Sequence, residues 1–342
     1  MKILVIRFKQ IGDSILASAL CNSLKETFPD SKIDYVLYEH VSPVFENHKS
    51  IDKVITISKK EQKNPFLYLM KVFKVTRKKY DIVIDIMSTP KSEFFTLFSL
   101  GAKYRIGRAK KYRGYTYTDK IEEPNNSKDK VDKFLKMLKP LEREYKVKYN
   151  YNYTINIKNE EKVYMKKKMI TAGIDFSKPI FACAINSRVP RKVYPIENMM
   201  QVIKTLLDKL NIQIIFYYSP DEKDFAKKVH EQLGNDTRIF SNIETSSIRE
   251  LAMLLSNCNM FFGNEGGPRH LAQALDIPSF AVFSPESDKK EWLANENPRH
   301  QGVEPKEFNI TKGMTRDEIY HLITPEFILS KVIEIYNKYV KI

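Results

Sequence analysis

Short apolar runs rich in β-branched residues alternate with longer segments of helical periodicity from one end of the chain to the other. Such a run predicts a buried strand, whereas apolar residues three or four positions apart predict a helix with one buried face. In the first half we expect strands at 3–8, 33–38, 53–57, 81–87 and 103–107, and helices beginning near Ser14, Pro65 and Lys91. This alternation is typical of a doubly wound parallel sheet.

The same alternation starts again after an irregular basic stretch and two helices near 128–139 and 159–172. Here we expect strands at 180–185, 212–218, 237–240, 259–262 and 279–283, separated by helices beginning near Pro195, Pro220, Ser247 and Pro268. We therefore predict an α/β protein with two Rossmann-like domains of doubly wound parallel sheet, 1–172 and 173–324, and a final helix within 325–342.

The composition is that of a globular protein, since 342 residues with 42% hydrophobic content are enough to bury the cores of two domains. No run approaches the roughly 18 consecutive apolar residues that span a membrane, and Arg7 and Lys9 interrupt the opening run too early for a secretory signal. We therefore expect a cytoplasmic protein. Cys21, Cys183 and Cys258 are far apart in the chain, which favours buried reduced thiols over disulfides or a zinc site.

Basic residues outnumber acidic residues by 57 to 42, and the net charge of +15 indicates either an anionic partner or a well solvated basic surface. The densest cluster, KYRIGRAKKYRGYTYTDK at 103–120, contains seven basic side chains and one acid. A phosphorylated substrate, an acidic membrane face and nucleic acid all fit this charge. Neither an aromatic RNA-binding sheet motif nor a GXXG loop accompanies it, so we expect no nucleic-acid partner.

Ligands of open α/β sheets bind beyond the carboxyl ends of the strands. Three stretches with candidate chemistry follow predicted strands: KQIGDS, NSRVPRKVYP and GNEGGPRHLAQAL. No G-x-G-x-x-G follows the first strand, which weakens the interpretation as an ordinary NAD enzyme. The sequence also lacks D-x-D, H-E-x-x-H, G-x-S-x-G and P-loop motifs, and so it contains no common metal or nucleophile signature.

In the first of these stretches Asp13 follows Gly12 and precedes a helical run. Aspartate is a preferred helix N-cap, and this is one expected role of Asp13. Because Gly12 leaves space beside it, Asp13 is also well placed to take a proton from a substrate hydroxyl.

The other two stretches suit a phosphate group. The loop at 187–192 would surround a diphosphate with cations and a hydroxyl, although loop cations in water explain the same residues. Gly266 and Gly267 let the backbone approach a ligand at the start of a helix, where unpaired amides carry partial positive charge; a tight turn alone also uses glycine. His270, taken singly, is typical of a hydrogen-bonded core histidine.

These motifs resemble glycosyltransferase family 9, the bacterial heptosyltransferases that build the inner core of lipopolysaccharide. The resemblance covers most of the chain and lies in ILVIRFKQIGDSILASALCNSLKETFPDSKIDYV, YDIVIDIMSTPKSEF, GAKYRIG, RKVYPIENMMQVI and GNEGGPRHLAQALDIPSFAVFSP, which occur in the order of the family. It implies the GT-B fold, in which two Rossmann-like domains face a central cleft, with a C-terminal helix that packs back on the first domain. It also implies an inverting transfer without metal or cofactor.

The resemblance further implies roles for single residues. Asp13 falls on the catalytic aspartate and Lys192 on the lysine that faces the donor diphosphate. Glu265 stands where aspartate is commoner, and Pro268 and Arg269 replace more apolar residues. The expected donor-binding residues are Ser187, Arg188, Lys192, Glu222, Glu265, Gly266, Gly267 and His270, and the expected acceptor-binding residues are Gly12, Lys91, Arg108 and Lys111.

From this resemblance we expect an enzyme that moves a sugar, heptose from ADP-heptose, onto inner-core lipopolysaccharide or a related cell-surface glycan. Its partners would be the nucleotide-sugar donor, an anionic glycolipid acceptor, and an anionic membrane surface that holds the enzyme peripherally at the cytoplasmic face. The alternatives are a sugar-nucleotide 2-epimerase of similar fold and a basic anion-binding or nucleic-acid-binding protein without activity. An isomeric nucleotide-sugar product identifies the epimerase, and salt-sensitive RNA binding without turnover identifies the binding protein.

Overall fold

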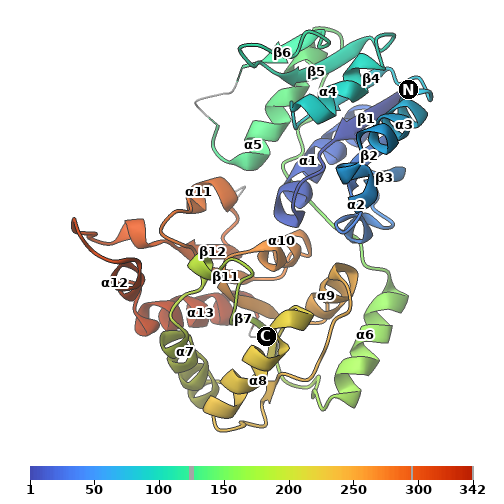
Figure 1. Cartoon of the computed structure of the whole chain (residues 1–342). Helices are drawn as coiled ribbons and strands as arrows, with labels where there is room; N and C mark the ends of the chain where they lie inside the picture. Colours follow the sequence, from blue (N-terminus) through green and yellow to red (C-terminus); the bar gives the residue numbers. More distant parts are fainter. Residues whose placement is uncertain (123–126, 294–295, 341–342) are drawn as a thin grey trace. The chain divides into compact units, whose positions relative to one another are not determined.

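The structure is a computed structural model that describes residues 1–122, 127–293 and 296–340. The chain divides into two compact units, Met1–Asn156 and Ile157–Ile342. Figure 1 shows that each unit is an α/β layer structure with helices on both faces of a sheet.

The division between the units precedes the expected boundary at 172/173, because one helix belongs to the second unit instead of the first. This helix, α6 (Asn159–Thr171), packs against α9 (Ile248–Leu255). Arg249 Nη2 lies 2.6 Å from Glu161 Oε2 and ties the two helices together. The apolar periodicity predicts this helix correctly, but it does not reveal the partner of the helix.

The first unit contains a six-stranded parallel sheet with the strand order β3-β2-β1-β4-β5-β6. The strands are β1 (Lys2–Ile6), β2 (Lys32–Tyr38), β3 (Lys53–Ile57), β4 (Ile82–Asp85), β5 (Tyr104–Arg108) and β6 (Asp119–Ile121). β1 is central, and its last four residues are completely buried because both faces of the sheet are covered. The five strands expected in this half are confirmed, whereas the hydrophobic pattern does not predict β6, whose sequence DKI is mostly polar.

Helices of the first unit are α1 (Ile11–Thr27), α2 (Lys59–Lys63), α3 (Pro65–Thr76), α4 (Pro90–Leu97) and α5 (Lys130–Leu135), with 3-10 turns η1 (Ser42–Phe45) and η2 (Lys136–Arg143). α1 packs against α5, and α3 packs against α4. α3 begins at Pro65 because Asn64 Oδ1 accepts the free N–H groups of Phe66 and Leu67. The strand order reverses between β1 and β4, and the carboxyl ends of these strands are therefore the ligand-binding point of the sheet.

The second unit repeats this plan with the order β12-β11-β10-β7-β8-β9. Its strands are β7 (Ile180–Ala184), β8 (Gln213–Phe216), β9 (Ile239–Phe240), β10 (Met260–Asn264), β11 (Ser279–Val282) and β12 (His300–Val303). β7 and β10 take the central positions that β1 and β4 take in the first sheet. The five expected strands are confirmed, and β12 is an addition that its half-polar sequence HQGV does not predict.

The remaining helices of the second unit are α7 (Ile196–Lys209), α8 (Lys223–Gln232), α10 (Gly267–Ala274), α11 (Lys289–Trp292), α12 (Arg316–His321) and α13 (Pro325–Tyr339), with 3-10 turns η3 (Pro190–Lys192), η4 (Pro220–Glu222) and η6 (Pro305–Glu307). α13 is the expected C-terminal helix, but it packs on α7 and β11 of its own unit. Val332 and Ile335 are completely buried there, and the Tyr336 ring contacts Phe181. The apolar stripe of α13 thus completes the second core, and the expected packing on the first domain stays a prediction.

Among the described residues, no helix combines the length and the apolar character that a membrane crossing needs. Cys21, Cys183 and Cys258 are free and buried, as expected. Burial raises the pKa of all three thiols, so none of them is activated as a nucleophile.

Candidate functional site

Asp13 lies just beyond the carboxyl end of β1, in the first turn of α1. It is not the N-cap that the sequence suggests, because the helix begins at Ile11 and Gln10 occupies the cap without a side-chain hydrogen bond. The carboxylate makes two ion pairs instead: Oδ1 lies 2.7 Å from Arg7 Nη2 and 3.8 Å from Lys130 Nζ. Its position is therefore fixed by cations and not by the helix end.

Arg7 is the principal partner of Asp13, and the sequence pattern did not reveal this role. Its side chain is nearly buried, and the guanidinium lies 4.7 Å from the centroid of the Phe134 ring. Both ion pairs of Asp13 among the described residues use Oδ1, so Oδ2 remains to accept a proton from a substrate. A basic residue directly after a buried strand, six positions before an aspartate, is the signal that points to such a pair.

A second carboxylate, Asp85, ends β4 beside β1 and is completely buried. It accepts hydrogen bonds from the Tyr117 hydroxyl at 2.7 Å and from the backbone N–H groups of Met87 and Ser88 at 2.9 Å. Burial raises the pKa of Asp85 to about 6, although these hydrogen bonds act in the opposite direction. Asp85 holds the loop after β4 in place, a role that the sequence did not indicate.

Two of the expected acceptor residues lie near these carboxylates. Gly12 is buried in the first turn of α1, next to Asp13. Arg108 ends β5, and its backbone N–H donates to Ser88 Oγ at 2.7 Å, beside the loop that Asp85 holds. These positions belong to the carboxyl edge of the first sheet.

The other two expected acceptor residues lie on different parts of the first unit. Lys91, near the start of α4, donates to the carbonyl oxygen of Gln62 at 3.1 Å. Lys111 is exposed in the connection between β5 and β6, with its Nζ 5.3 Å from the centroid of the Tyr112 ring. The structure does not bring either lysine into contact with Asp13.

In the second unit, Lys192 and Glu265 form an ion pair at the carboxyl ends of β7 and β10. Lys192 Nζ lies 2.9 Å from Glu265 Oε2. The loop that carries Lys192 is held against β10, because Asn264 Oδ1 accepts the backbone N–H of Tyr194 at 2.8 Å and its Nδ2 donates to the Ala184 carbonyl at 3.0 Å. The lysine is thus fixed at both its side chain and its backbone.

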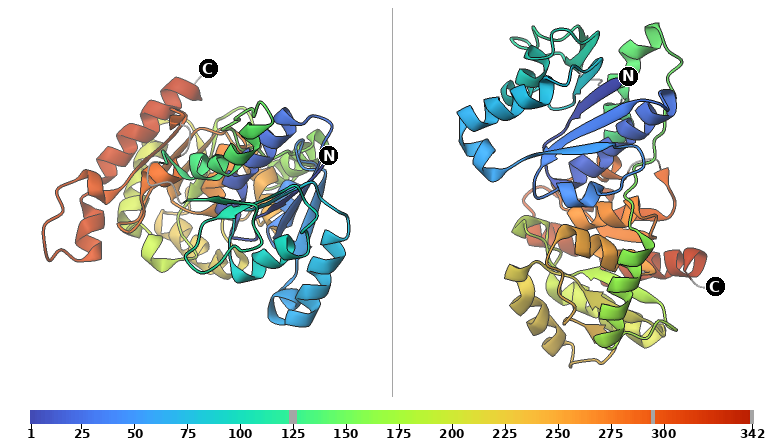
Figure 2. Two further views of the ribbon diagram at one scale, coloured as in Figure 1. Left: turned by 90° about the horizontal axis from the view of Figure 1, so that it is seen from above. Right: turned by 90° about the vertical axis from the view of Figure 1, so that its right-hand side faces the viewer.

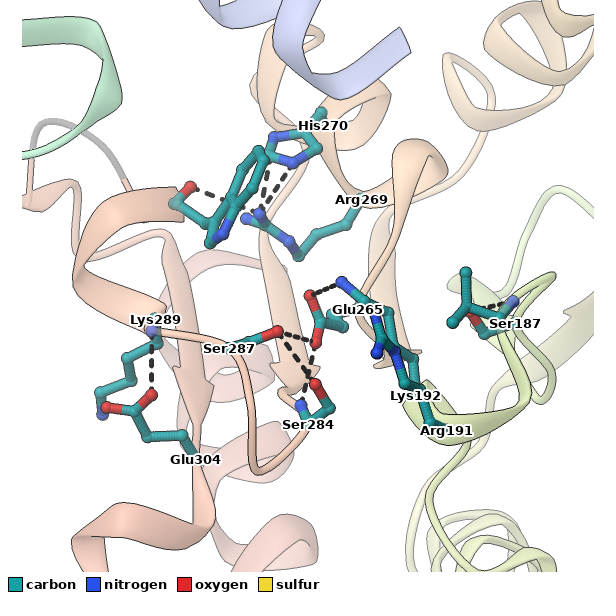
Figure 3. A network of polar contacts seen from close by, with 12 residues as sticks. Ser187, Arg191, Lys192, Glu265, Arg269, His270, Ser284, Ser287, Lys289 and Glu304 are labelled. Carbon is teal, nitrogen blue, oxygen red and sulfur yellow. Dashed lines mark hydrogen bonds and ion pairs between the residues drawn. The ribbon is translucent and has the colours of Figure 1, made fainter. Parts of the chain in front are cut away.

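Glu265 is only 5% exposed and uses both of its carboxylate oxygens within the protein. Figure 3 shows that Oε1 accepts from the backbone N–H of Ser284 and from the Ser287 hydroxyl, while Oε2 accepts from Lys192. Burial acts to raise the pKa of Glu265, but these three hydrogen bonds outweigh it and the pKa is lowered. Glu265 therefore positions Lys192 and the loop after β11.

The three glycines around Glu265 differ in what they permit. Gly263 has φ +119°, and a Cβ on it would lie 2.5 Å from the Ala184 carbonyl oxygen, so the contact between β10 and β7 requires glycine. A Cβ on Gly266 would meet only Pro268 Cδ, at 3.7 Å. Gly266 caps α10 and Gly267 is its first residue, so open backbone precedes a helix start whose N–H groups suit an anion.

His270 lies on α10 as a buried and hydrogen-bonded histidine, as expected from the residue taken singly. Arg269 Nη2 lies 3.1 Å from His270 Nε2, and Arg269 Nη1 donates to Gln273 Oε1 at 2.8 Å. The centroid of the Trp292 ring lies 5.3 Å from that of the imidazole, and Figure 3 shows His270 beside Arg269. Because a guanidinium only donates, the imidazole nitrogen in this contact is the acceptor.

The remaining donor candidates gather near the ends of β7 and β8. Asn186 Nδ2 donates to Glu222 Oε1 at 2.8 Å, and Glu222 Oε2 accepts from the Ser219 hydroxyl and backbone N–H. The hydrogen bond between Asn186 and Glu222 anchors the loop that continues with Ser187 and Arg188. The expected donor residues therefore all lie along the carboxyl edge of the second sheet. Among the described residues, no group of three or more His, Cys, Asp and Glu side chains is arranged to hold a metal.

Known proteins with similar sequences are sugar transferases. Residues 69–314 match the model of glycosyltransferase family 9 (heptosyltransferase). Lipopolysaccharide heptosyltransferase 3 of Escherichia coli is 22% identical over 289 residues, 80% of each chain. Lipopolysaccharide heptosyltransferase 1 of Campylobacter coli is 23% identical over 295 residues, 83% of this chain and 84% of its own.

Solved structures show the same GT-B fold. A family 9 glycosyltransferase from Veillonella parvula has a TM-score of 0.83 at 20% identity, over 98% of this chain and 97% of that one. E. coli ADP-heptose lipopolysaccharide heptosyltransferase II has a TM-score of 0.77 at 17% identity, over 99% of both chains. A UDP-GlcNAc 2-epimerase from Methanocaldococcus jannaschii reaches 0.51 at 16% identity, over 99% of this chain and 100% of that one. Fold alone therefore does not separate transferase from epimerase, but the match over residues 69–314 does: the chain is a glycosyltransferase that belongs to family 9, the heptosyltransferases.

Proposed function

We propose that this protein transfers heptose from ADP-heptose to inner-core lipopolysaccharide or a related cell-surface glycan, with inversion at the anomeric carbon and without a metal ion. The observation that carries the proposal is the ion pair of Lys192 with Glu265, directly before the open start of α10. A fixed cation beside a row of helix amides suits a nucleotide diphosphate. The similar E. coli heptosyltransferase solved with ADP-2-deoxy-2-fluoro heptose supports the choice of donor.

In the proposed reaction Asp13 Oδ2 takes the proton of the acceptor hydroxyl. The hydroxyl oxygen attacks the anomeric carbon from the side opposite the diphosphate, and the bond to the diphosphate breaks as the glycosidic bond forms. The configuration at that carbon therefore inverts. Lys192 and the amides at the start of α10 stabilise the negative charge that develops on the leaving ADP. Arg7 keeps Asp13 in the position that proton transfer needs.

The proposal assigns the neutralisation of the leaving group to protein cations, because the sequence contains no D-x-D and the 187–192 loop supplies Arg188, Arg191 and Lys192. No cofactor takes part. The acceptor in this proposal is an anionic glycolipid, and the enzyme works at the cytoplasmic face of the membrane that contains it.

Asp13→Asn tests the assignment of the base. The amide keeps the size of the side chain and its oxygen still accepts from Arg7, but it cannot take a proton. We expect kcat to fall by about 10²-fold or more, with the donor Kd unchanged by calorimetry. A rate within about tenfold of the parent would remove Asp13 from the role of base.

The reaction class is tested on the products. Transfer consumes the acceptor and releases ADP, and NMR of the glycoside gives the anomeric configuration; an isomeric nucleotide-sugar formed without acceptor would instead show epimerisation. EDTA should leave the transfer rate unchanged. Inactivation by EDTA that magnesium or manganese reverses would contradict metal independence.

A further inference from the structure

Seven large apolar side chains are exposed on two neighbouring helices of the first unit, and the proposed reaction uses none of them. This α3–α4 patch consists of Phe66, Leu67, Met70 and Phe73 on α3, with Leu97, Phe98 and Leu100 at and just after the end of α4. Phe66 is 70% exposed, and Met70 and Phe73 are each more than half exposed. Among the described residues, every exposed phenylalanine belongs to this patch.

α3 is apolar on two opposite sides. Val72 and Val75 face the core of the first unit, whereas Phe66, Met70 and Phe73 face away from it. A helix on the surface of a globular protein normally has a polar outer side, and a contiguous exposed apolar area marks a binding surface. The outer side of α3 is therefore expected to have a partner.

α3 and α4 present the patch as one surface. The Phe73 and Phe98 rings meet edge to face with centroids 6.1 Å apart, and Phe98 also contacts Phe94. Nearer the starts of the helices, the Tyr68 hydroxyl donates to the Lys91 carbonyl at 2.6 Å. Figure 2 shows α3 at the margin of the first unit, with α4 beside it in the right-hand view.

The margin of the patch along α3 is basic. The segment 59–79 contains eight lysines and arginines and one acid, Glu61. Lys74 is exposed within the patch, and the Arg77 guanidinium lies 6.0 Å from the centroid of the Phe73 ring. This charge excludes a basic partner.

The margin along α4 is also basic. The loop at 109–118, which we call the basic loop, packs on α4 because Thr116 Oγ1 lies 2.6 Å from Thr96 Oγ1. Its Lys110 and Lys111 are exposed, as is Tyr115 at 83%. Basic segments thus include α3 and pack against α4, the two helices that carry the apolar patch.

We propose that the α3–α4 patch docks on an anionic lipid bilayer, with its aromatic and aliphatic side chains at the level of the acyl boundary and its lysines and arginines on the head groups. Apolar insertion and attraction to anionic lipid together give the two signals that stable peripheral binding needs. A second copy is a poorer partner, because it would bring two basic margins together in a chain of net charge +15.

The position of the patch suits a lipid-linked acceptor, and in this respect the inference rests on the proposed function. α4 directly follows β4, so its start lies at the carboxyl edge of the sheet, where Asp13 also lies. The start of α3 lies at the same edge, since Tyr68 contacts Lys91 there. A bilayer on the patch would bring a glycolipid head group to the acceptor side of the first unit.

The test is the binding of the parent and of a triple variant, Phe66→Ser, Met70→Ser and Phe73→Ser, to vesicles of phosphatidylglycerol and phosphatidylcholine in equal parts. The matched control is Val163→Ser, Tyr164→Ser and Ile170→Ser, which removes three exposed apolar side chains from α6 of the second unit. We expect the triple variant to partition at least about tenfold more weakly than the parent, because three large side chains no longer enter the bilayer. The control should bind like the parent.

Equal binding by the parent and the triple variant overturns the proposal, and so does a parent that fails to bind these vesicles. A parent dimer that the triple variant converts to a monomer, without vesicle binding, assigns the patch to self-association and also overturns it. Circular dichroism and the thermal midpoint verify that each variant is folded. The double variant Phe66→Ser with Met70→Ser is a milder change, and its vesicle binding gives a second test. Transfer to a soluble acceptor separates the two proposals. If the proposed reaction is wrong, the parent does not transfer sugar to this acceptor. If only the docking proposal is wrong, the parent still does.

Discussion

Asp85 is a residue whose burial makes the stability of the fold depend on pH, because its pKa is raised to about 6. The folded protein binds this proton more tightly than the unfolded chain, so the contribution to stability is gained as pH falls from above 6 toward 4 and is lost as pH rises through 6. Asp85→Asn removes that titration. We expect the difference in unfolding free energy between parent and variant to change by up to about 3 kcal/mol between pH 8 and pH 4.

Urea unfolding of both proteins across that pH range measures the difference directly. Burial lowers the pKa of His48 to about 4 and of His300 to about 3, so both histidines cost stability as pH falls below their ordinary pKa. They are present in parent and variant alike and cancel in the difference. A difference that stays constant with pH would mean that Asp85 titrates normally.

Glu265 offers a second test at the scale of one residue. Glu265→Gln replaces one carboxylate oxygen with an amide that donates, so the contact with Lys192 is lost while the shape of the side chain is kept. We expect the Kd for ADP to rise by about tenfold and the unfolding free energy to fall by about 1–3 kcal/mol.

The matched control for this variant is Glu304→Gln in the same unit. Glu304 is 8% exposed and accepts the backbone N–H of Lys289 at 3.0 Å, so its loss should lower stability without a change in ADP affinity. Calorimetric titration with ADP measures the affinity of both variants. Equal ADP affinity in both would show that the Lys192–Glu265 pair lies outside the donor site.

At the scale of elements, strand β10 and the start of α10 place different demands on the two glycines that they contain or precede. Gly263→Ala forces a Cβ against Ala184 and keeps a positive φ, so we expect a loss of about 3 kcal/mol or failure to fold. Gly266→Ala finds open space, so its thermal midpoint should stay within a few degrees of the parent. If ADP contacts the backbone at Gly266, Gly266→Ala should also weaken ADP binding. Unchanged ADP affinity in this variant would contradict that contact.

The elements were largely predictable because their signals are local. The buried run of β1 and the Asn64–Pro65 start of α3 are examples in which a few neighbouring residues determine an element. β12 gave no such signal, since HQGV becomes a strand only by pairing with β11. The short strand β6 likewise depends on its neighbour β5.

The candidate site was predictable in its positions but not in its internal contacts. Asp13 and Lys192 stand after strands, and the topology of an open sheet brings such residues to one edge. The ion pair of Asp13 with Arg7 depends on the turn between β1 and α1, which the sequence does not define. The assignment of Asp13 as N-cap fails for the same reason, because the helix starts at Ile11 with Gln10 as its cap, three residues earlier than an Asp13 cap requires.

At the scale of the whole molecule, the excess positive charge is not uniformly available to a partner. In the expected cluster at 103–120, Lys103 pairs with Glu144, and Arg105 donates to three backbone carbonyls. These two side chains hold the fold together. Lys110 and Lys111 of the basic loop are instead exposed, in a loop that packs on α4.

Neutralising the basic loop with Lys110→Gln, Lys111→Gln and Arg113→Gln should therefore weaken vesicle binding through charge alone. Near an anionic leaflet each basic residue contributes about 1 kcal/mol, so we expect a loss of roughly 10²-fold at low ionic strength. The matched control, Lys204→Gln, Lys209→Gln and Lys228→Gln, changes the net charge equally with three exposed lysines of the second unit. A loss of the same size in this control would attribute the attraction to net charge and not to the loop.

The dependence of vesicle binding on ionic strength distinguishes the contribution of the basic loop from that of the apolar patch. The Debye length falls from about 8 Å at physiological ionic strength to about 3 Å at 1 M, so the deficit of the loop variant should disappear at high salt. Apolar transfer into the bilayer is not screened, so the deficit of the Phe66, Met70 and Phe73 variant should persist there. If both deficits disappear together, the membrane holds this protein by charge alone and the exposed phenylalanines of α3 and α4 serve another partner.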